Sequence, residues 1–329
     1  MRACPVARWQ ATEMVLQLDP RFVLLWRDPT SLQFGLDSPR AVLDDVSNAE
    51  ERMIAALVIG ISRPGLTLIA RGAGSDDTAV EHLLRRVAPA LRPQLNTRWP
   101  AAKSPEKRHR GDSLAAGNGP ASGDSRAAVT VTGSGPTVDA MATTLAASGL
   151  KVRLVGEDVN AAAQAADVAV IVAQFVVNPE FYGLWLRRDR PHLPVVFGDT
   201  GAQIGPFVEP GVTACLYCMF RTKADTDPAW PALACQLWGT RSAADRGLVA
   251  AEAAVIATRL VLERVTRATP GPATAVWLDA ASGATRAVPC RPHPECGCAV
   301  LPENGKVAAS LSVAVPSPPR TAATADAPG

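Results

Sequence analysis

The first clear pattern of apolar and polar positions is a pair of short apolar runs within residues 22–37. Asp28 and Pro29 separate the two runs, and this pairing is typical of a turn, so the segment predicts a β-hairpin. Ser47 then stands as an N-cap, with acidic residues in the following turn and apolar residues continuing to Ile59. A side-chain acceptor at this position and negative charge in the first turn both favour a helix.

A further helix is predicted to begin at Asp76 and Asp77 and to end before Pro89, because its apolar residues recur at three- and four-residue spacing. A hairpin followed by helices forms a small α+β unit. For residues 1–100 the pattern therefore predicts an α+β domain of winged-helix-like shape.

After residue 127 strands and helices alternate, which predicts an α/β domain with a Rossmann-like, mostly parallel sheet. Five apolar runs are predicted as its strands, at 127–132, 151–155, 167–172, 194–197 and 203–208. The segment 137–148 suits a helix, since Pro136 in its first turn costs no hydrogen bond. A later helix, 242–267, is apolar nearly all round and is expected to be buried. The runs 274–278 and 284–289 predict a closing antiparallel hairpin.

Two segments cannot pack a core. Residues 101–127 combine Pro, Gly, Ser and charge with almost no large apolar residue, which is typical of a flexible linker. Its basic run, 107–110, is expected to be solvated. Residues 303–329 are rich in Ala, Pro and Ser and predict a disordered tail. The second domain is accordingly assigned to 128–302.

Composition and charge exclude several classes of protein. The 329 residues suffice for two domains, each with its own core. Lys and Arg number 33 against 31 Asp and Glu, so nucleic acid is not an expected partner. The N-terminal sequence lacks the apolar region of a signal peptide, and the most apolar stretch, 167–177, is too short to span a bilayer. The chain is predicted to be cytoplasmic, without a membrane partner.

The strongest chemical signal comes from four of the seven cysteines. Cys215 and Cys218 form a CxxC pair, and Cys296 and Cys298 form a CxC pair. Two thiolate pairs make one tetrahedral zinc site, and in a reducing compartment such spacing favours metal over disulfides. The sequence predicts a structural zinc ion that staples the C-terminal hairpin to the sheet.

Other assignments of the cysteine region stay open. Cys290 and His293 are the alternative ligands if the CxC geometry fails, and four unmetallated thiols or a disulfide are the remaining interpretation. Cys235 lies on an apolar helical stretch and Cys4 at a chain end. Cysteines in such places are usually inert.

A glycine turn between the first strand and helix of the second domain resembles a nucleotide-binding loop, whose amides could hold a phosphate. The predicted nucleotide residues are Gly133, Gly135, Glu157 and Asp158. The third glycine position of such a loop is Val138, and Asp139 would repel a phosphate at the same helix end. The turn is therefore an incomplete signature.

Three motifs together resemble a known family. They are GAQIGPFVEPGVTACLYC at 201–218, DPAWP at 227–231 and HPECGC at 293–298. The chain is similar in these motifs to actinobacterial ThiF-like proteins, which have the ubiquitin-activating type of fold. In particular it resembles the leader-peptide-binding partners of YcaO cyclodehydratases in thiazole/oxazole-modified microcin biosynthesis. The likeness covers about 128–300, and over 20–100 it implies a peptide-recognition domain.

The resemblance implies that a precursor peptide adds as a strand to the N-terminal sheet. Active members of the family carry an Arg and a Lys between their second and third strands, where they neutralise the triphosphate. Here that segment is 156–166, and it contains neither residue. Lys151 and Arg153 lie within the second strand itself, so no other cation is obviously placed to substitute. The chain is therefore predicted to be a non-catalytic scaffold.

Two other functions remain as alternatives. The first is an ATP-dependent ThiF-type adenylyltransferase, against which the short segment 156–166 argues. The second is a structural or regulatory dimer without a peptide or nucleotide ligand, because sequence does not reveal whether a sheet edge is free. The expected partners are a precursor peptide or a YcaO-type enzyme, and a homodimer is left open.

Overall fold

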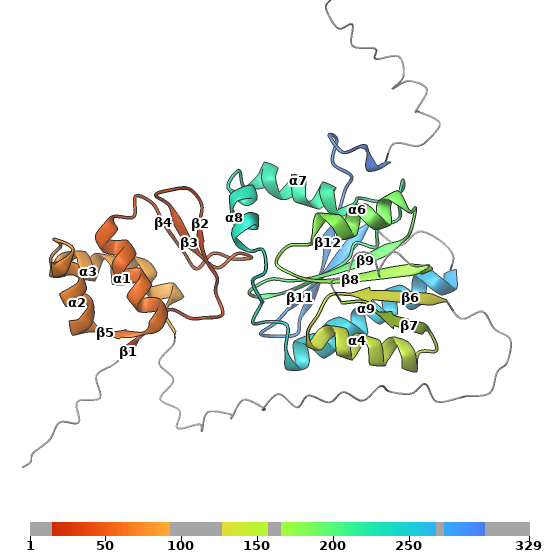
Figure 1. The fold of residues 1–329 in the computed structure, drawn as a ribbon, viewed down its shortest axis with the longest axis horizontal. Coiled ribbons are helices and arrows are strands. Elements are labelled where there is room, and N and C mark those ends of the chain that lie inside the picture. Colours follow the sequence, from red (N-terminus) through yellow and green to blue (C-terminus); the bar gives the residue numbers. More distant parts are fainter. Residues whose placement is uncertain (1–14, 93–126, 157–165, 268–272, 300–329) are drawn as a thin grey trace, which may run out of the picture.

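The computed structural model describes residues 15–92, 127–156, 166–267 and 273–299, which form eight α-helices and three β-sheets. The helices are α1 (Asn48–Ile59), α2 (Arg63–Gly72), α3 (Asp77–Val87), α4 (Pro136–Ala147), α6 (Pro179–Arg187), α7 (Leu216–Thr226), α8 (Trp230–Gln236) and α9 (Gly247–Arg267). Figure 1 shows an N-terminal group of elements beside a larger group built around one sheet. The predicted tail at 303–329 and all but the last residue of the predicted linker lie outside the described residues.

The N-terminal group contains a three-stranded antiparallel sheet and three helices. Its strands are β2 (Leu24–Trp26), β3 (Leu32–Phe34) and β4 (Ala41–Leu43), in the order β2-β3-β4. Leu24 pairs with Phe34, which confirms the predicted hairpin. A two-stranded sheet joins β1 (Val15–Leu16) to β5 (Ile61–Ser62). Helices α1, α2 and α3 share one buried apolar cluster with β3 and β4.

Local caps explain where these helices begin. The Ser47 hydroxyl accepts a hydrogen bond from the Glu50 amide, and the Glu50 carboxylate accepts one from the Ser47 amide, which completes a capping box for α1. Asp76 caps α3 in the predicted place. Helix α2 was not expected from the sequence. Its Pro64 stands in the first turn, where proline is tolerated, and does not end a helix there.

The larger group is built on a seven-stranded sheet with the order β12-β11-β10-β9-β8-β6-β7. Its strands are β6 (Ala128–Thr132), β7 (Lys151–Leu154), β8 (Val168–Gln174), β9 (His192–Phe197), β10 (Gly201–Ile204), β11 (Thr274–Asp279) and β12 (Thr285–Pro289). Strands β7, β6, β8 and β9 pair in parallel, and β10, β11 and β12 follow antiparallel. Only β10 and β12 run against the others, so the sheet is mostly parallel, as predicted.

Two predicted boundaries are wrong. The fifth strand is predicted to reach Val208, but β10 ends at Ile204, because Gly205 has a φ of +87° and turns the chain. The last helix was expected from residue 242, but it begins at Gly247. The preceding residues form a turn in which the Ser242 hydroxyl bonds to backbone groups.

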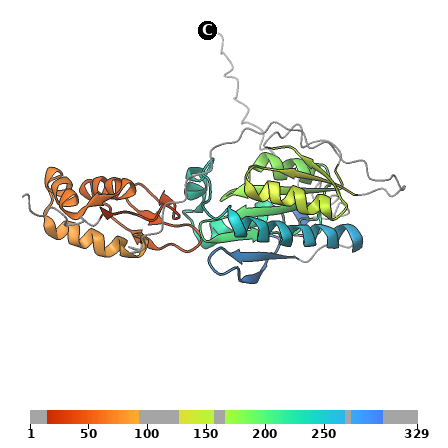
Figure 2. The same ribbon diagram turned by 90° about the horizontal axis from the view of Figure 1, so that it is seen from below.

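Helices cover both faces of the large sheet. Helices α4 and α9 lie side by side on one face, where they share the main core with the strands (Figure 2). Helices α6 and α7 lie on the other face, where Trp185 and Leu216 pack against Ile171. The prediction that the last helix is buried nearly all round is wrong in part, since Leu248 and Val255 of α9 are 73% and 41% exposed. Among the described residues, no helix is both long and apolar enough to cross a membrane.

Side-chain hydrogen bonds join the two groups. Arg27 forms an ion pair with Asp227, with 2.6 Å between Nη2 and Oδ1. The Asp37 carboxylate accepts from the Thr200 amide at 3.0 Å, and in return Asp199 accepts from the amides of Leu36 and Asp37 at 2.5 and 3.1 Å. Burial and the neighbouring Asp37 raise the pKa of Asp199 to about 6. These contacts place the N-terminal sheet next to α7 and α8.

Candidate functional site

Four cysteines that are far apart in the sequence meet in one cluster. Cys215 precedes α7 and Cys218 lies in its first turn, so the CxxC pair sits at a helix start. Cys296 and Cys298 follow β12 near the end of the described chain. The four sulfur atoms all lie within 4.8 Å of one another. This arrangement joins the C-terminal segment to the α7 face of the sheet.

The sulfur positions suit a tetrahedral metal ion. The Sγ–Sγ distances are 3.8 Å for Cys215–Cys218, 3.7 Å for Cys215–Cys296 and 3.3 Å for Cys218–Cys298. Four sulfurs about 2.3 Å from a zinc ion stand about 3.8 Å apart. Burial raises the pKa of the Cys215 thiol and raises that of Cys298 to about 11, so a cation is needed to hold both as thiolates. The four cysteines can therefore hold a metal ion with no position left open for chemistry.

The alternative ligands lie outside this cluster. The Cys290 thiol points to the carbonyl of Val288. Both ring nitrogens of His293 are engaged, since Nε2 lies 2.7 Å from the Asp225 carboxylate and Nδ1 accepts from the Glu295 amide. Cys235 is exposed on α8, away from the cluster.

Close packing explains why the first residue of the glycine turn is a glycine. Gly133 has a φ of +111°, and a Cβ atom there would lie 2.2 Å from the carbonyl oxygen of Val172 on the neighbouring strand. Its amide donates to the carbonyl of Gly156. Glycine is required here because the turn passes directly over β8, whether or not a ligand is bound.

A carboxylate of the protein occupies the start of helix α4. Asp245 accepts from the Thr137 amide at 3.2 Å, from the Thr137 hydroxyl at 2.6 Å and from the Gln174 amide group at 2.9 Å. A Cβ atom on Gly135 would lie 2.6 Å from the same carboxylate. The amide and the positive helix end that would attract a phosphate therefore already face an internal anion. Sequence reasoning missed Asp245, which lies more than a hundred residues from the turn.

One cation lies beside the turn and was also missed. Arg241 donates to the Ser134 hydroxyl at 3.3 Å, and both residues line a cavity of about 270 Å³ next to Gly133. The expectation that no cation stands near the turn is therefore wrong, because the loop before α9 returns to it. The predicted ribose ligands Glu157 and Asp158 lie outside the described residues.

Among the described residues, the two edges of the N-terminal sheet differ in what pairs with them. On the β2 edge, Gln236 of α8 replaces a strand: its side-chain oxygen accepts from the Trp26 amide at 2.8 Å, and its NH2 group donates to the Trp26 carbonyl at 2.6 Å. On the other edge, β4 pairs with β3 alone among the described strands. An unpaired edge leaves backbone N–H and C=O groups free to bind another strand.

An exposed side chain and a helix lie beside β4. Val42, in the middle of β4, is 46% exposed. Helix α3 lies against the strand, and its Arg86 donates to the Asp44 carbonyl just beyond the strand end and to the Glu50 carboxylate. Beside β4, the described residues thus present one exposed apolar side chain and a charged helix.

Comparisons with known proteins do not assign a family. No family model matches the chain, and no curated protein matches it. Among solved structures, 87% of the chain is similar to the heterocyclase TruD, at 17% identity and a TM-score of 0.37. It is also similar to the E. coli microcin synthetase McbBCD complex (12% identity, TM-score 0.39) and to the microcin C7 enzyme MccB in complex with N-formylated MccA (11% identity, TM-score 0.41).

The extent of these likenesses differs between the structures. The match covers 42% of the TruD chain and 100% of the McbBCD and MccB chains. The chain thus spans about two fifths of the TruD structure. TM-scores of this size do not define a shared function.

Proposed function

We propose that the protein is a non-catalytic scaffold that binds a peptide as an added strand on β4. The observation that carries this proposal is the contrast between the two edges of the N-terminal sheet. The β2 edge is occupied by the Gln236 side chain, whereas β4 has no second strand among the described residues. Strand addition obtains its affinity from main-chain hydrogen bonds, which only the open edge can supply.

The charges around the glycine turn argue against adenylation. Adenylation needs positive charge where the triphosphate is held. At the start of α4 the nearest ligand-like group is the Asp245 carboxylate, which repels phosphate. The proposed structural zinc at the cysteine cluster adds no catalytic position either, because all four ligands come from the protein.

The motif resemblance gives the proposed partner. The segment 201–218 and the two shorter motifs resemble leader-peptide-binding partners of YcaO cyclodehydratases, so the proposed ligand is a precursor peptide that the scaffold presents to such an enzyme. The alternative is a ThiF-type adenylyltransferase. Arg241 beside Ser134 favours that alternative, since a cation there could meet a phosphate.

A selected peptide and its methylated derivatives test the proposal. A displayed library of random 15-residue peptides is selected on the full chain, and the best binder is resynthesised with single N-methyl groups along its backbone. In a β-strand alternate residues turn their N–H toward the partner strand. We expect N-methylation at every second residue of the paired segment to abolish binding and N-methylation between them to be tolerated.

Two variants supply the control. Val42→Pro removes the backbone N–H donor of residue 42 in β4. Gln236→Ala removes the side chain that occupies the β2 edge and leaves β4 unchanged. We expect the selected peptide to lose at least tenfold in affinity for Val42→Pro and to keep its affinity for Gln236→Ala. Equal binding to all three proteins, or a methylation pattern without a period of two, would rule out strand addition at β4.

A further inference from the structure

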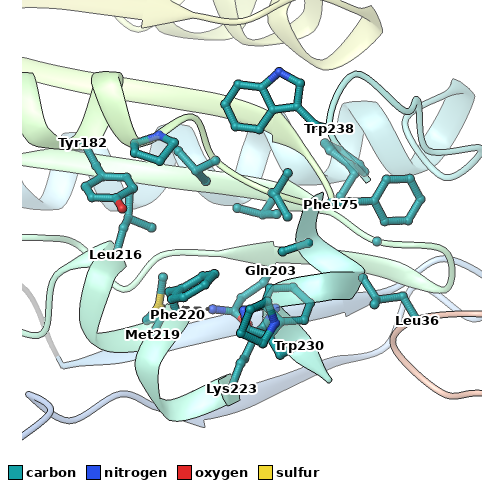
Figure 3. A pocket seen from close by; sticks show the side chains of 18 of the residues that line it. Leu36, Phe175, Tyr182, Gln203, Leu216, Met219, Phe220, Lys223, Trp230 and Trp238 are labelled. Carbon is teal, nitrogen blue, oxygen red and sulfur yellow. Dashed lines mark hydrogen bonds between the residues drawn. The ribbon is translucent and has the colours of Figure 1, made fainter. Parts of the chain in front are cut away.

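An apolar cavity lies between the large sheet and the helices α7 and α8, apart from the cysteine cluster and from β4. Its volume is about 410 Å³, within the range of cavities that bind small ligands. Figure 3 shows aromatic side chains from several elements around a common space. The aromatic lining residues are Phe175, Tyr182, Phe197, Tyr217, Phe220, Trp230, Trp238 and Trp277.

The aromatic side chains also contact one another. Tyr217 and Phe220 are stacked, with ring centroids 6.4 Å apart, and Phe220 lies 6.1 Å from Trp230 at a tilt of 56°. These contacts fix flat apolar surfaces on α7 and α8. A ligand with a flat apolar body would replace water on several of them at once.

One ammonium group faces this apolar space. Lys223 of α7 lines the cavity, and its Nζ atom lies 4.5 Å from the centroid of the Trp230 ring. The Lys223 side chain is exposed, so it lies at the rim of the cavity; desolvation beside the cavity lowers its pKa, and the charge of Asp37 offsets this in part. In the described part of the chain, Lys223 has no ion pair with a carboxylate. Its three N–H donors are therefore available to a ligand.

The remaining charge in the cavity is already engaged. The Asp37 carboxylate accepts from the Thr200 amide at 3.0 Å and from the Thr200 hydroxyl at 3.2 Å. A cationic ligand would meet the Lys223 ammonium on the Trp230 ring, so aromatic cation binding is disfavoured. A neutral apolar ligand would gain nothing from the charge of Lys223, whose exposed side chain would stay in contact with solvent.

We infer that this cavity binds an aromatic carboxylate, with the apolar body between the aromatic side chains of α7, α8 and the sheet and the carboxylate on the Lys223 ammonium. A free aromatic acid and an acidic residue next to an aromatic residue in a peptide present the same chemistry. This cavity is separate from β4, so a failure of this inference would leave the proposed function untouched, and the reverse also holds.

Matched pairs of ligands test the inference by calorimetry on the full chain. The first pair is 2-naphthoate and 2-naphthamide, and the second is acetyl-Trp-Glu-amide and acetyl-Trp-Gln-amide. In each pair an uncharged amide of nearly the same shape replaces the carboxylate. We expect at least one acid to bind at least about tenfold more tightly than its amide, and the pair that binds identifies the source of the carboxylate.

Three variants assign the binding to this cavity. Lys223→Met should remove the preference for the acid, and Lys151→Met, which changes an exposed lysine on β7, should leave it intact. Ala234→Phe places a ring in the cavity from α8 and should weaken acid and amide alike. Equal binding of acid and amide by the native chain, retained preference in Lys223→Met, or no binding of any of the four ligands at millimolar concentration would overturn the inference.

Discussion

The cysteine cluster and the glycine turn both appear in the sequence as short motifs, yet the fold completes them in opposite ways. At the cluster, two segments bring four sulfurs close enough together to hold a metal ion, and no cationic side chain of the described residues is among the four ligands. At the turn, the chain itself supplies the anion: Asp245 lies where the amide of Thr137 would meet a phosphate. A short motif therefore predicts a bound ligand only when no other group of the chain occupies the position that the ligand would take.

Among the substitutions considered, one at the cysteine cluster should lower the stability of the protein most. Cys218→Ser removes one of four sulfur ligands, and loss of a structural zinc site can cost about 10 kcal/mol of apparent folding free energy. We expect the variant to lose both bound zinc and its cooperative thermal unfolding transition. The matched control is Cys235→Ser, which changes an exposed cysteine outside the cluster. Metal analysis and calorimetry measure both, and a folded Cys218→Ser protein with native stability would contradict the zinc assignment.

A smaller effect is expected from the glycine that packs against β8. Gly133→Ala combines a positive φ with a Cβ atom 2.2 Å from the Val172 carbonyl, and strain and overpacking together should cost about 3 kcal/mol or more. Gly149→Ala is the control, because it has a φ of +86° and no neighbour within 4 Å, so only about 1 kcal/mol is expected. Urea unfolding measures the difference. Equal losses would show that close packing does not explain Gly133.

Asp245→Asn tests whether the carboxylate keeps anions away from the start of α4. It keeps the side-chain shape but removes the charge that accepts from Thr137 and Gln174, which should cost about 1 to 3 kcal/mol of stability. It should also make the start of α4 available to anions. We expect ADP to bind more tightly to Asp245→Asn than to the native chain in calorimetry. If the native chain binds ADP equally well or better, the carboxylate does not block the site.

The smallest effect is expected at Arg241, which is exposed beside Ser134. Arg241→Gln should change the unfolding free energy by no more than about 0.5 kcal/mol. It should weaken the ADP binding gained in Asp245→Asn, because it removes the cation nearest the turn. Unchanged ADP affinity in the double variant would mean that Arg241 does not reach the phosphate.

Local signals in the sequence predict much of the fold. Ser47 and Asp76 mark helix starts because caps depend on neighbouring residues only. Helix α2 has no such clear signal, because a proline such as Pro64 can follow one helix or begin the next, and the packing of Leu66 decides between the two. The direction of β10 and the exposure of Leu248 follow from tertiary arrangement and have no local signal.

The candidate sites show the same division. The four cysteines could be grouped from spacing, since sulfur pairs of this kind combine around one ion. The partner at the glycine turn could not be predicted, because Asp245 reaches it only when the loop before α9 folds over β8. The hydrogen bond from Gln236 to the edge of β2 could not be predicted either, because it depends on how the N-terminal group packs against the larger group.

Amide hydrogen exchange with the selected peptide shows whether the peptide pairs with β4. The free chain should show fast exchange at outward amides within Ala41–Leu43, because β4 pairs with β3 alone among the described strands. We predict that saturating peptide slows exchange within Ala41–Leu43 at least tenfold and leaves exchange within Leu24–Trp26 unchanged. Protection confined to Leu24–Trp26, or to the surface of the large sheet with β4 unaffected, would contradict the account of this protein as a scaffold that binds peptide by strand addition.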